Sequence, residues 1–221
     1  KKAKDFLKNA KVDDTFVLFI AGHGVHDTDR DETYYFLTHN ADRYNFSGSC
    51  ANFELVEDLL QGIAPRNKLF LMDTCESGEI EDAVQDRYYA AAGSRGLKAR
   101  AARALKIAPK AGKGRQARTY LYQKDRYVYN DLMRRSGAIV FSSSRGGEFS
   151  YESDAIQNGY FTKEIISAIQ DRAADKNRDG LVSTNELREH VSRSVAKRTG
   201  DLQHPTVDRD NLYQKFAFPV K

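Results

Sequence analysis

The chain has 221 residues, of which 40% are hydrophobic and 30% charged, and a net charge of +4. This composition is typical of a globular protein with a proper core, and it excludes an intrinsically disordered chain. No apolar run approaches the roughly 18 residues of a membrane span. Two cysteines exclude a disulfide scaffold, and we expect a reducing, cytoplasmic location and no membrane partner. The first residue is lysine rather than methionine, so we expect a piece of a longer chain with flanking domains.

The first half of the chain predicts two helices and three strands. Residues Lys1–Ala10 read as the end of a helix, and the continuous apolar run Thr15–Ile20 reads as a strand buried on both faces. Thr33–Thr38 is a further strand. Asn52 can cap a helix whose apolar residues recur at helical spacing as far as Ile63. Leu69–Met72 is the next strand.

The second half begins with a long irregular insertion over residues 79–131. After it, Gly137–Phe141 is a third short apolar run. Helices are expected over Phe161–Ala173 and Leu187–Ala196, and a late strand over Asn211–Val220 that Pro219 ends. Strands that alternate with helices predict a mostly parallel sheet with helices on both faces, in one domain over residues 1–221.

Ligands of such sheets bind beyond the carboxyl ends of the strands. Three apolar runs end in segments that hold side chains capable of catalysis or binding: Gly22-His23-Gly24, Asp73-Thr74-Cys75 and Ser142-Ser143-Ser144. A free thiol has a pKa near about 8.5 and needs a base to become the nucleophilic thiolate. An imidazole can take that proton and return it to a leaving amine. We therefore expect Cys75 and His23 to act together.

Other residues of the same types are weaker candidates. His26 is the rival base, but it lacks the glycines that flank His23. Cys50 lies in a polar loop and is expected to be inert. The remaining histidines read as surface or loop residues: His39, His190 and His204.

The segments AGHG, DTCESG and GAIVFSSSRGGEFSYES resemble the caspase-like cysteine peptidases, particularly bacterial members and the metacaspases. The resemblance implies a three-layer α/β/α sandwich, with Cys75 as nucleophile and His23 as base and acid. It also implies an oxyanion hole made by the backbone N–H groups of Gly24 and Cys75. The third segment, which holds Ser143 and Glu152, would face the substrate.

Two departures from the animal caspase pattern concern specificity. Asp73 stands where caspases have glutamine, and Glu152 where they have the arginine that pairs with a substrate aspartate. Residues i and i+2 of a strand share a face, so Asp73 is expected in the same cleft as Cys75. An acidic pocket predicts peptide substrates cleaved after Arg or Lys. The alternative is that Asp73 caps backbone amides and Glu152 is solvated.

Residues 175–186 fit the twelve-residue EF-hand loop, with Gly180 at the sharp turn. Such a loop would bind Ca²⁺, as a structural or regulatory ion, and the chemistry of a cysteine peptidase needs no cofactor. The same residues could instead form turns and caps. The expected oxygen ligands come from side chains and one carbonyl: Asp175, Asn177, Asp179, Leu181 (carbonyl), Ser183 and Glu186.

The insertion is strongly basic, because residues 87–126 hold twelve Lys/Arg and a single acid, Asp125. Leu97, Ala101 and Leu105 allow a short basic helix. The arm could be solvated, or it could be an internal substrate or occluder of the acidic pocket. Nucleic-acid docking is disfavoured because no aromatic platform interleaves the charges.

The sequence thus predicts a cysteine endopeptidase with a preference for basic residues, autoprocessed in its insertion and modulated by Ca²⁺. A second class stays open, a catalytically silent module of the same fold that binds a partner or senses calcium. A non-peptidase hydrolase on a doubly wound sheet is a third, because fold alone does not fix function.

Overall fold

A computed structural model of the chain describes residues 2–26, 33–42, 44–75, 93, 96–100, 136–145, 148–207 and 216–219. The elements are α1 (Lys2–Phe6), a 3₁₀ helix η1 (Leu7–Asn9), β1 (Thr15–His26), β2 (Tyr34–Phe36), α2 (Phe46–Ser49), β3 (Ala51–Asn52), α3 (Phe53–Gln61), β4 (Asn67–Cys75), β5 (Lys98–Arg100), β6 (Ala138–Ser142), β7 (Ser150–Ser153), β8 (Asn158–Gly159), α6 (Tyr160–Gln170), β9 (Leu181–Ser183), α7 (Thr184–Thr199), β10 (Thr206–Val207) and β11 (Ala217–Pro219).

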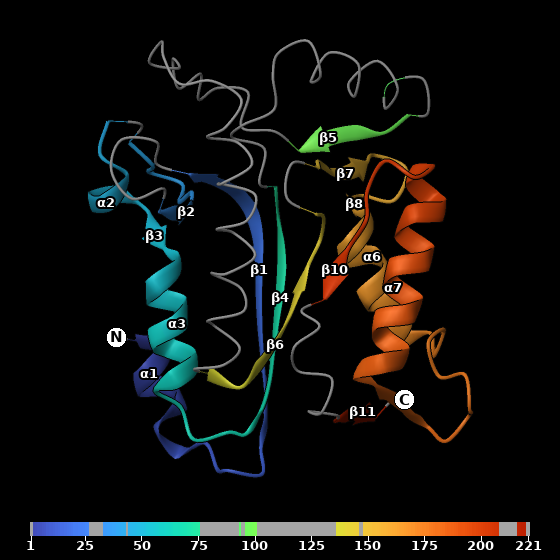
Figure 1. The fold of residues 1–221 in the computed structure, drawn as a ribbon, viewed down its shortest axis with the longest axis horizontal. Helices are drawn as coiled ribbons and strands as arrows, with labels where there is room; N and C mark the ends of the chain where they lie inside the picture. Colours follow the sequence, from blue (N-terminus) through green and yellow to red (C-terminus); the bar gives the residue numbers. More distant parts are fainter. Residues whose placement is uncertain are drawn as a thin grey trace, which may run out of the picture.

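The central sheet has six strands in the order β10-β6-β4-β1-β2-β3. Strands β1, β4 and β6 run parallel, while β10, β2 and β3 pair antiparallel with their neighbours. In Figure 1 the sheet is seen nearly edge-on, with α1 and α3 on one side and α6 and α7 on the other. This is the predicted α/β/α sandwich with a mostly parallel sheet.

One face of the sheet packs against α3. Asn52 caps that helix as predicted, because its side chain accepts a hydrogen bond from the N–H of Leu55. The buried residues of α3 recur at helical spacing and meet the alternate residues of β4. Together these apolar side chains form one core cluster, which includes Phe53, Val56, Leu60, Phe70 and Met72.

The other face packs against α6 and α7, which cover the remaining alternate residues of β4 and β6, among them Leu69, Leu71 and Phe141. A buried charge lies in this helical layer. The carboxylate of Glu164 on α6 is 2% exposed and meets His190 Nε2 at 3.1 Å and Arg198 Nε at 2.7 Å, both on α7. Burial acts to raise the pKa of Glu164, but the His190 hydrogen bond and the Arg198 charge outweigh it and hold that pKa below its ordinary value.

Strand β1 differs from its prediction in length and burial. It continues through His23 to His26, because its last three residues pair with β2. His23 therefore lies within the strand rather than beyond it. The strand is also not buried on both faces, since Val17 and Phe19 are 44% and 45% exposed. Among the described residues, the cluster beneath α6 and α7 does not extend to this part of β1.

The other elements largely follow the sequence pattern. The late strand is confirmed at β11, which pairs with β9 and ends at Pro219, while residues 208–215 lie outside the described residues. Strand β10, which pairs with β6, was not predicted. Most of the 79–131 insertion also lies outside the described residues, as do Ala101 and Leu105. Where the insertion is described, the predicted basic helix is wrong, because residues 98–100 form strand β5.

Strand β5 belongs to a small second sheet of order β5-β7-β8. In Figure 1 this sheet lies near the carboxyl ends of β1 and β4, on the side of α6 and α7. Its core is Leu97, Phe149 and Tyr151, all buried. Within the described part of the chain, no helix combines the length and the apolar character needed to cross a membrane.

Candidate active site

The backbones of His23 and Cys75 lie side by side where the neighbouring parallel strands β1 and β4 end their pairing. Strands β1 and β4 pair in parallel from Thr15 and Asn67 onward, and the last pair in that register is His23 with Cys75. On its other side the His23 carbonyl accepts the N–H of Leu37 at 2.9 Å. The His23 side chain is exposed. The two residues predicted to act together are thus placed opposite one another by strand pairing.

Gly24 is required by the packing of Tyr34 against β1. A Cβ at Gly24 would lie 1.7 Å from the Tyr34 hydroxyl, which no real contact allows. That hydroxyl is also 2.7 Å from Oγ1 of Thr74, the residue before Cys75. Glycine here therefore lets a side chain from β2 reach across β1 to β4, a reason that the sequence did not reveal. The predicted oxyanion role of the Gly24 N–H remains a prediction.

Asp73 lies under the first turn of α6. Its side chain is 1% exposed, and its Oδ2 accepts a hydrogen bond from the hydroxyl of Thr162, the third residue of that helix. The partial positive charge of a helix N-terminus favours a carboxylate at this place. Asp73 and Leu71 are two residues apart on β4 and therefore share a face of the sheet. On β1, His23 lies on that same face, because it pairs with Cys75. The carboxylate is thus buried within the layer that faces α6.

Ser143 connects the end of β6 to both neighbouring elements. Its hydroxyl donates to the Thr74 carbonyl at 3.1 Å and lies in hydrogen-bonding contact with the Ser150 hydroxyl at the start of β7. Its N–H donates to the Met72 carbonyl at 2.8 Å. Ser143 is fully buried. In the structure it joins β4, β6 and β7.

Glu152 lies two residues beyond Ser150, partly buried on β7. Its backbone pairs with Lys98 of β5 on one side and with Gly159 of β8 on the other. It is therefore farther along β7 from the Ser143 contact than Ser150 is. Nothing is described of the side chains of Cys75 and of His26, the rival base.

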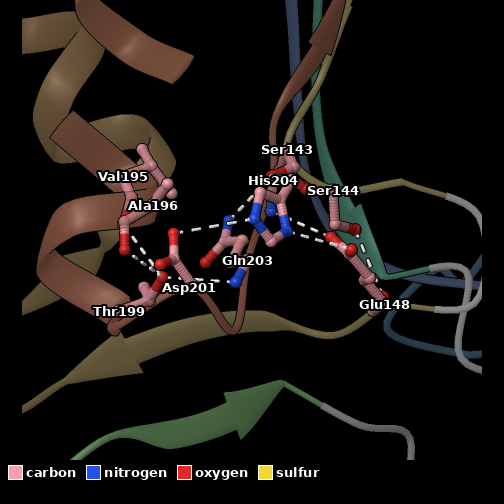
Figure 2. Close-up of polar contacts among 9 residues, drawn as sticks. All are labelled: Ser143, Ser144, Glu148, Val195, Ala196, Thr199, Asp201, Gln203 and His204. Carbon is pink, nitrogen blue, oxygen red and sulfur yellow. Dashed lines mark hydrogen bonds and ion pairs between the residues drawn. The ribbon is translucent and has the colours of Figure 1, made fainter. Parts of the chain in front are cut away.

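Two residues that the sequence reasoning missed hold the connection between β6 and β7 (Figure 2). Gln203, fully buried, donates to the Ser143 carbonyl at 2.8 Å and accepts the N–H of Tyr151 at 2.9 Å. His204, predicted to be an ordinary loop residue, contacts both carboxylate oxygens of Glu148, through its N–H at 2.9 Å and its Nδ1 at 3.0 Å. No motif marks either residue in the sequence. A lone glutamine after a helix-ending glycine gives no signal of a buried role.

The EF-hand-like loop is closed by its own hydrogen bonds. Asp175 Oδ2 accepts the N–H of Gly180 at 3.1 Å, and Asp179 Oδ1 accepts that of Leu181 at 2.8 Å. Ser183 and Glu186 form a reciprocal capping box at the start of α7. The Ser183 N–H is the main cause that lowers the pKa of Glu186.

The fit of this loop to a metal ion is mixed. Asp175 Oδ1, at the first predicted ligand position, is buried and makes no hydrogen bond within the described residues. Against this, no three carboxylate, imidazole or thiol side chains in the described part of the chain are grouped as a metal site, and that part includes the whole loop. Ca²⁺ binding therefore remains a prediction, beside the turn and cap bonds that the loop makes.

The sequence model of the caspase domain family matches residues 1–217, and the chain belongs to that family. The family is one of cysteine peptidases. A crystal structure of protein GSU0716 from Geobacter sulfurreducens is similar, with a TM-score of 0.52 and 18% identity over 100% of this chain and 72% of that one. At this identity the likeness concerns the fold alone. No curated protein sequence matches the chain.

Proposed function

We propose that this caspase-family domain is an active cysteine endopeptidase in which Cys75 is the nucleophile and His23 the general base and acid. The observation that carries the proposal is the β1–β4 register, which sets His23 opposite Cys75 at the carboxyl ends of parallel strands. Ligands of parallel sheets bind at this edge. The exposed His23 side chain is accessible to a substrate there.

In the proposed reaction the Cys75 thiol loses its proton to His23, and the thiolate attacks the carbonyl carbon of the scissile peptide bond. The tetrahedral oxyanion is stabilised by backbone N–H groups, with Gly24 and Cys75 as the proposed donors. The C–N bond breaks as the imidazolium returns the proton to the leaving amine. Water then hydrolyses the thioester and regenerates the thiol.

We further propose that the substrates are proteins or peptides cleaved after Arg or Lys. Asp73 supports this proposal, because a carboxylate that is 1% exposed stands two residues before the nucleophile. A buried carboxylate gains most from a charged partner, which a basic substrate side chain supplies. The Thr162 hydroxyl donates a hydrogen bond to Oδ2 of Asp73. Ser143 and Glu152 are proposed as further substrate-binding residues, with Glu152 as the second carboxylate of the acidic pocket.

The experiment that tests this proposal compares three fluorogenic peptides that differ only in ending in Arg, Lys or Asp. The wild-type chain is expected to cleave the first two and to leave the third, and Cys75→Ala is expected to cleave none. Efficient cleavage after Asp would refute the basic specificity. Equal turnover by Cys75→Ala would refute the nucleophile.

Two regulatory features belong to the same proposal. One is self-processing inside the basic insertion. The other is Ca²⁺ binding by the loop over residues 175–186, favoured by its ligand spacing and by the buried Asp175 Oδ1. Binding would require Glu186 to exchange its present hydrogen bonds for the ion. Calorimetry with Ca²⁺ should give heat for the wild type and much less for Glu186→Gln, and no difference would count against binding.

A further inference from the structure

Glu148 fixes the connection between β6 and β7 to the rest of the domain. Its N–H donates to the Arg145 carbonyl at 3.0 Å, and its own carbonyl accepts the Ser144 hydroxyl at 3.2 Å. These two bonds close the connection on itself. The Glu148 side chain extends outward and meets His204, which lies between α7 and β10 (Figure 2). Glu148 therefore links two segments that are distant in sequence.

The segment that carries His204 is anchored at both ends. At its start, the Asp201 N–H donates to the Ala196 carbonyl of α7 at 2.8 Å. The Gln203 N–H donates to the buried Thr199 hydroxyl at 3.2 Å. At its end, β10 pairs with β6. His204 is thus held on a fixed support, and the side chain of Glu148 docks against it.

Two carboxylates face the His204 ring among the described residues. Nδ1 lies 3.0 Å from Glu148 Oε1, and Nε2 lies 3.8 Å from Asp201 Oδ1. Glu148 and His204 are only 18% and 29% exposed, whereas Asp201 is 85% exposed. Exposed pairs contribute little, so Glu148 is the stronger partner. The other residues drawn in Figure 2 carry no charge.

The contact between His204 and Glu148 changes in strength with protonation of the ring. A carboxylate oxygen only accepts, so Nδ1 carries a hydrogen and Nε2 is the nitrogen that gains or loses the proton. Histidine changes charge between about pH 5 and 8. In acid the ring is a cation and the hydrogen bond to Glu148 is charged at both ends. At alkaline pH the bond remains, but its donor is neutral and the bond is weaker.

The connection held by Glu148 leads directly into strand β7, which carries a proposed substrate-binding residue. Ser150, the first residue of β7, contacts the Ser143 hydroxyl through its own hydroxyl. The Ser143 hydroxyl also donates to the carbonyl of Thr74, the residue before Cys75. A displacement at Glu148 therefore reaches the start of β7 and the substrate side of the site.

We propose that Glu148 and His204 are positioning residues for substrate binding, and that a proton on His204 strengthens their hold on the start of β7. This inference rests on the proposed peptidase function. It does not require either side chain to touch the substrate or the reacting atoms. The pair acts on the affinity for the peptide rather than on the chemical step, and it makes that affinity greater in acid than at alkaline pH.

The test measures peptide affinity apart from catalysis. An arginine-ended peptide with rhodamine on its N-terminus is titrated with the Cys75→Ala chain, and fluorescence anisotropy gives Kd between about pH 5 and 8. Arginine keeps its charge throughout this range, so the peptide itself does not titrate. We expect Kd to rise by about threefold to fivefold from the acidic to the alkaline end, as loss of one partly exposed ion pair predicts.

Three variants of the Cys75→Ala chain assign this dependence. Glu148→Gln keeps an oxygen that accepts the hydrogen bonds but removes the charge, so its Kd should stay near the alkaline value of the parent at every pH. His204→Gln should do the same. The double variant should bind no more weakly than either single one, because both changes remove one interaction. His39→Gln, at an exposed histidine of another loop, is the matched control and should keep the parent's pH dependence.

Turnover of a matching fluorogenic peptide by the wild type distinguishes two failures. If the wild type does not cleave it, the peptidase function fails, and the inference fails with it. If cleavage occurs but Kd is independent of pH, or Glu148→Gln keeps the pH dependence, the inference alone is overturned. Additive losses in the double variant would also overturn it, because the two side chains would then act separately. Melting temperatures at each pH confirm that the variants are folded.

Discussion

The hydroxyl of Tyr34 on β2 lies 2.7 Å from that of Thr74 on β4, across the strand β1 that separates them. Both residues are buried, and Gly24 leaves the space through which Tyr34 reaches. The contact joins three strands next to Cys75. Removing it should loosen the backbone that carries the proposed nucleophile.

Tyr34→Phe is expected to lower the free energy of unfolding by about 1–2 kcal/mol, because the buried Thr74 hydroxyl loses a partner. Tyr35→Phe is the matched control. Tyr35 is the neighbouring buried tyrosine of β2, and its ring packs beside that of Phe46. Urea unfolding of both variants makes the comparison. Equal losses would show that the Thr74 contact contributes nothing specific.

Gln203→Leu should impair substrate binding more than chemistry. Gln203 holds the Ser143 carbonyl and the Tyr151 N–H, and so fixes where β7 begins relative to β6. Its loss leaves both groups buried without that partner. We expect KM for an arginine-ended peptide to rise about tenfold or more, the effect of roughly 1.4 kcal/mol, with a smaller change in kcat.

Gln170→Leu is the control for this change, because Gln170 is exposed at the end of α6. It should leave KM unchanged. Steady-state kinetics of the folded variants give the two constants separately. A Gln203→Leu enzyme with an unchanged KM, or one in which only kcat falls, would show that Gln203 does not position β7.

Asp73→Asn should remove the preference for basic residues while keeping the Thr162 hydrogen bond available to the amide oxygen. Loss of one partner of a buried charge pair costs about 2–5 kcal/mol, so kcat/KM for an arginine-ended peptide should fall by about 30-fold or more. A peptide that ends in an uncharged residue should lose far less. If both peptides fell equally, Asp73 would act on folding or chemistry rather than on specificity.

The lowered pKa of Glu164 predicts how the free energy of unfolding depends on pH. Its pKa in the folded chain is below its ordinary value, so the unfolded chain binds more protons between the two values. The stabilisation is complete above the ordinary glutamate pKa and is lost as pH falls through the folded one. Urea unfolding at stepped acidic pH should show the wild type losing stability more steeply than Glu164→Gln.

At neutral pH, Glu164→Gln should be less stable than the wild type by about 1–3 kcal/mol, because the ion pair with Arg198 is lost and the hydrogen bond to His190 is weakened. Glu189→Gln is the control, since its carboxylate is half exposed on α7. Parallel pH profiles for wild type and Glu164→Gln would contradict the prediction.

The sequence predicted the layers of the fold because periodicity records burial. The continuous apolar run of β4 and the helical spacing of α3 and α6 are local patterns that survive in the structure. The exposure of Val17 and Phe19 could not be predicted in this way. A run of apolar residues reads as buried on both faces, whether or not a helix covers the second face.

The candidate site was predicted only where a motif marks it. Their positions at the ends of apolar runs identified His23 and Cys75 as candidates. The β1–β4 register supports their pairing. Gln203 and Tyr34 act through contacts across more than 35 residues of sequence, which no local pattern records. The short strand β5 was missed for a related reason, because three residues are too few to show a period.

The most direct test of the central claim uses the two cysteines of the chain as reporter and control. An arginine-ended peptidyl chloromethyl ketone should alkylate Cys75 and leave Cys50, a partly buried free thiol, essentially unlabelled. In His23→Ala the rate at Cys75 should fall by about 100-fold or more, the usual contribution of a general base. Labelling of Cys75 no faster than Cys50, or at the same rate without His23, would contradict a His23–Cys75 catalytic pair.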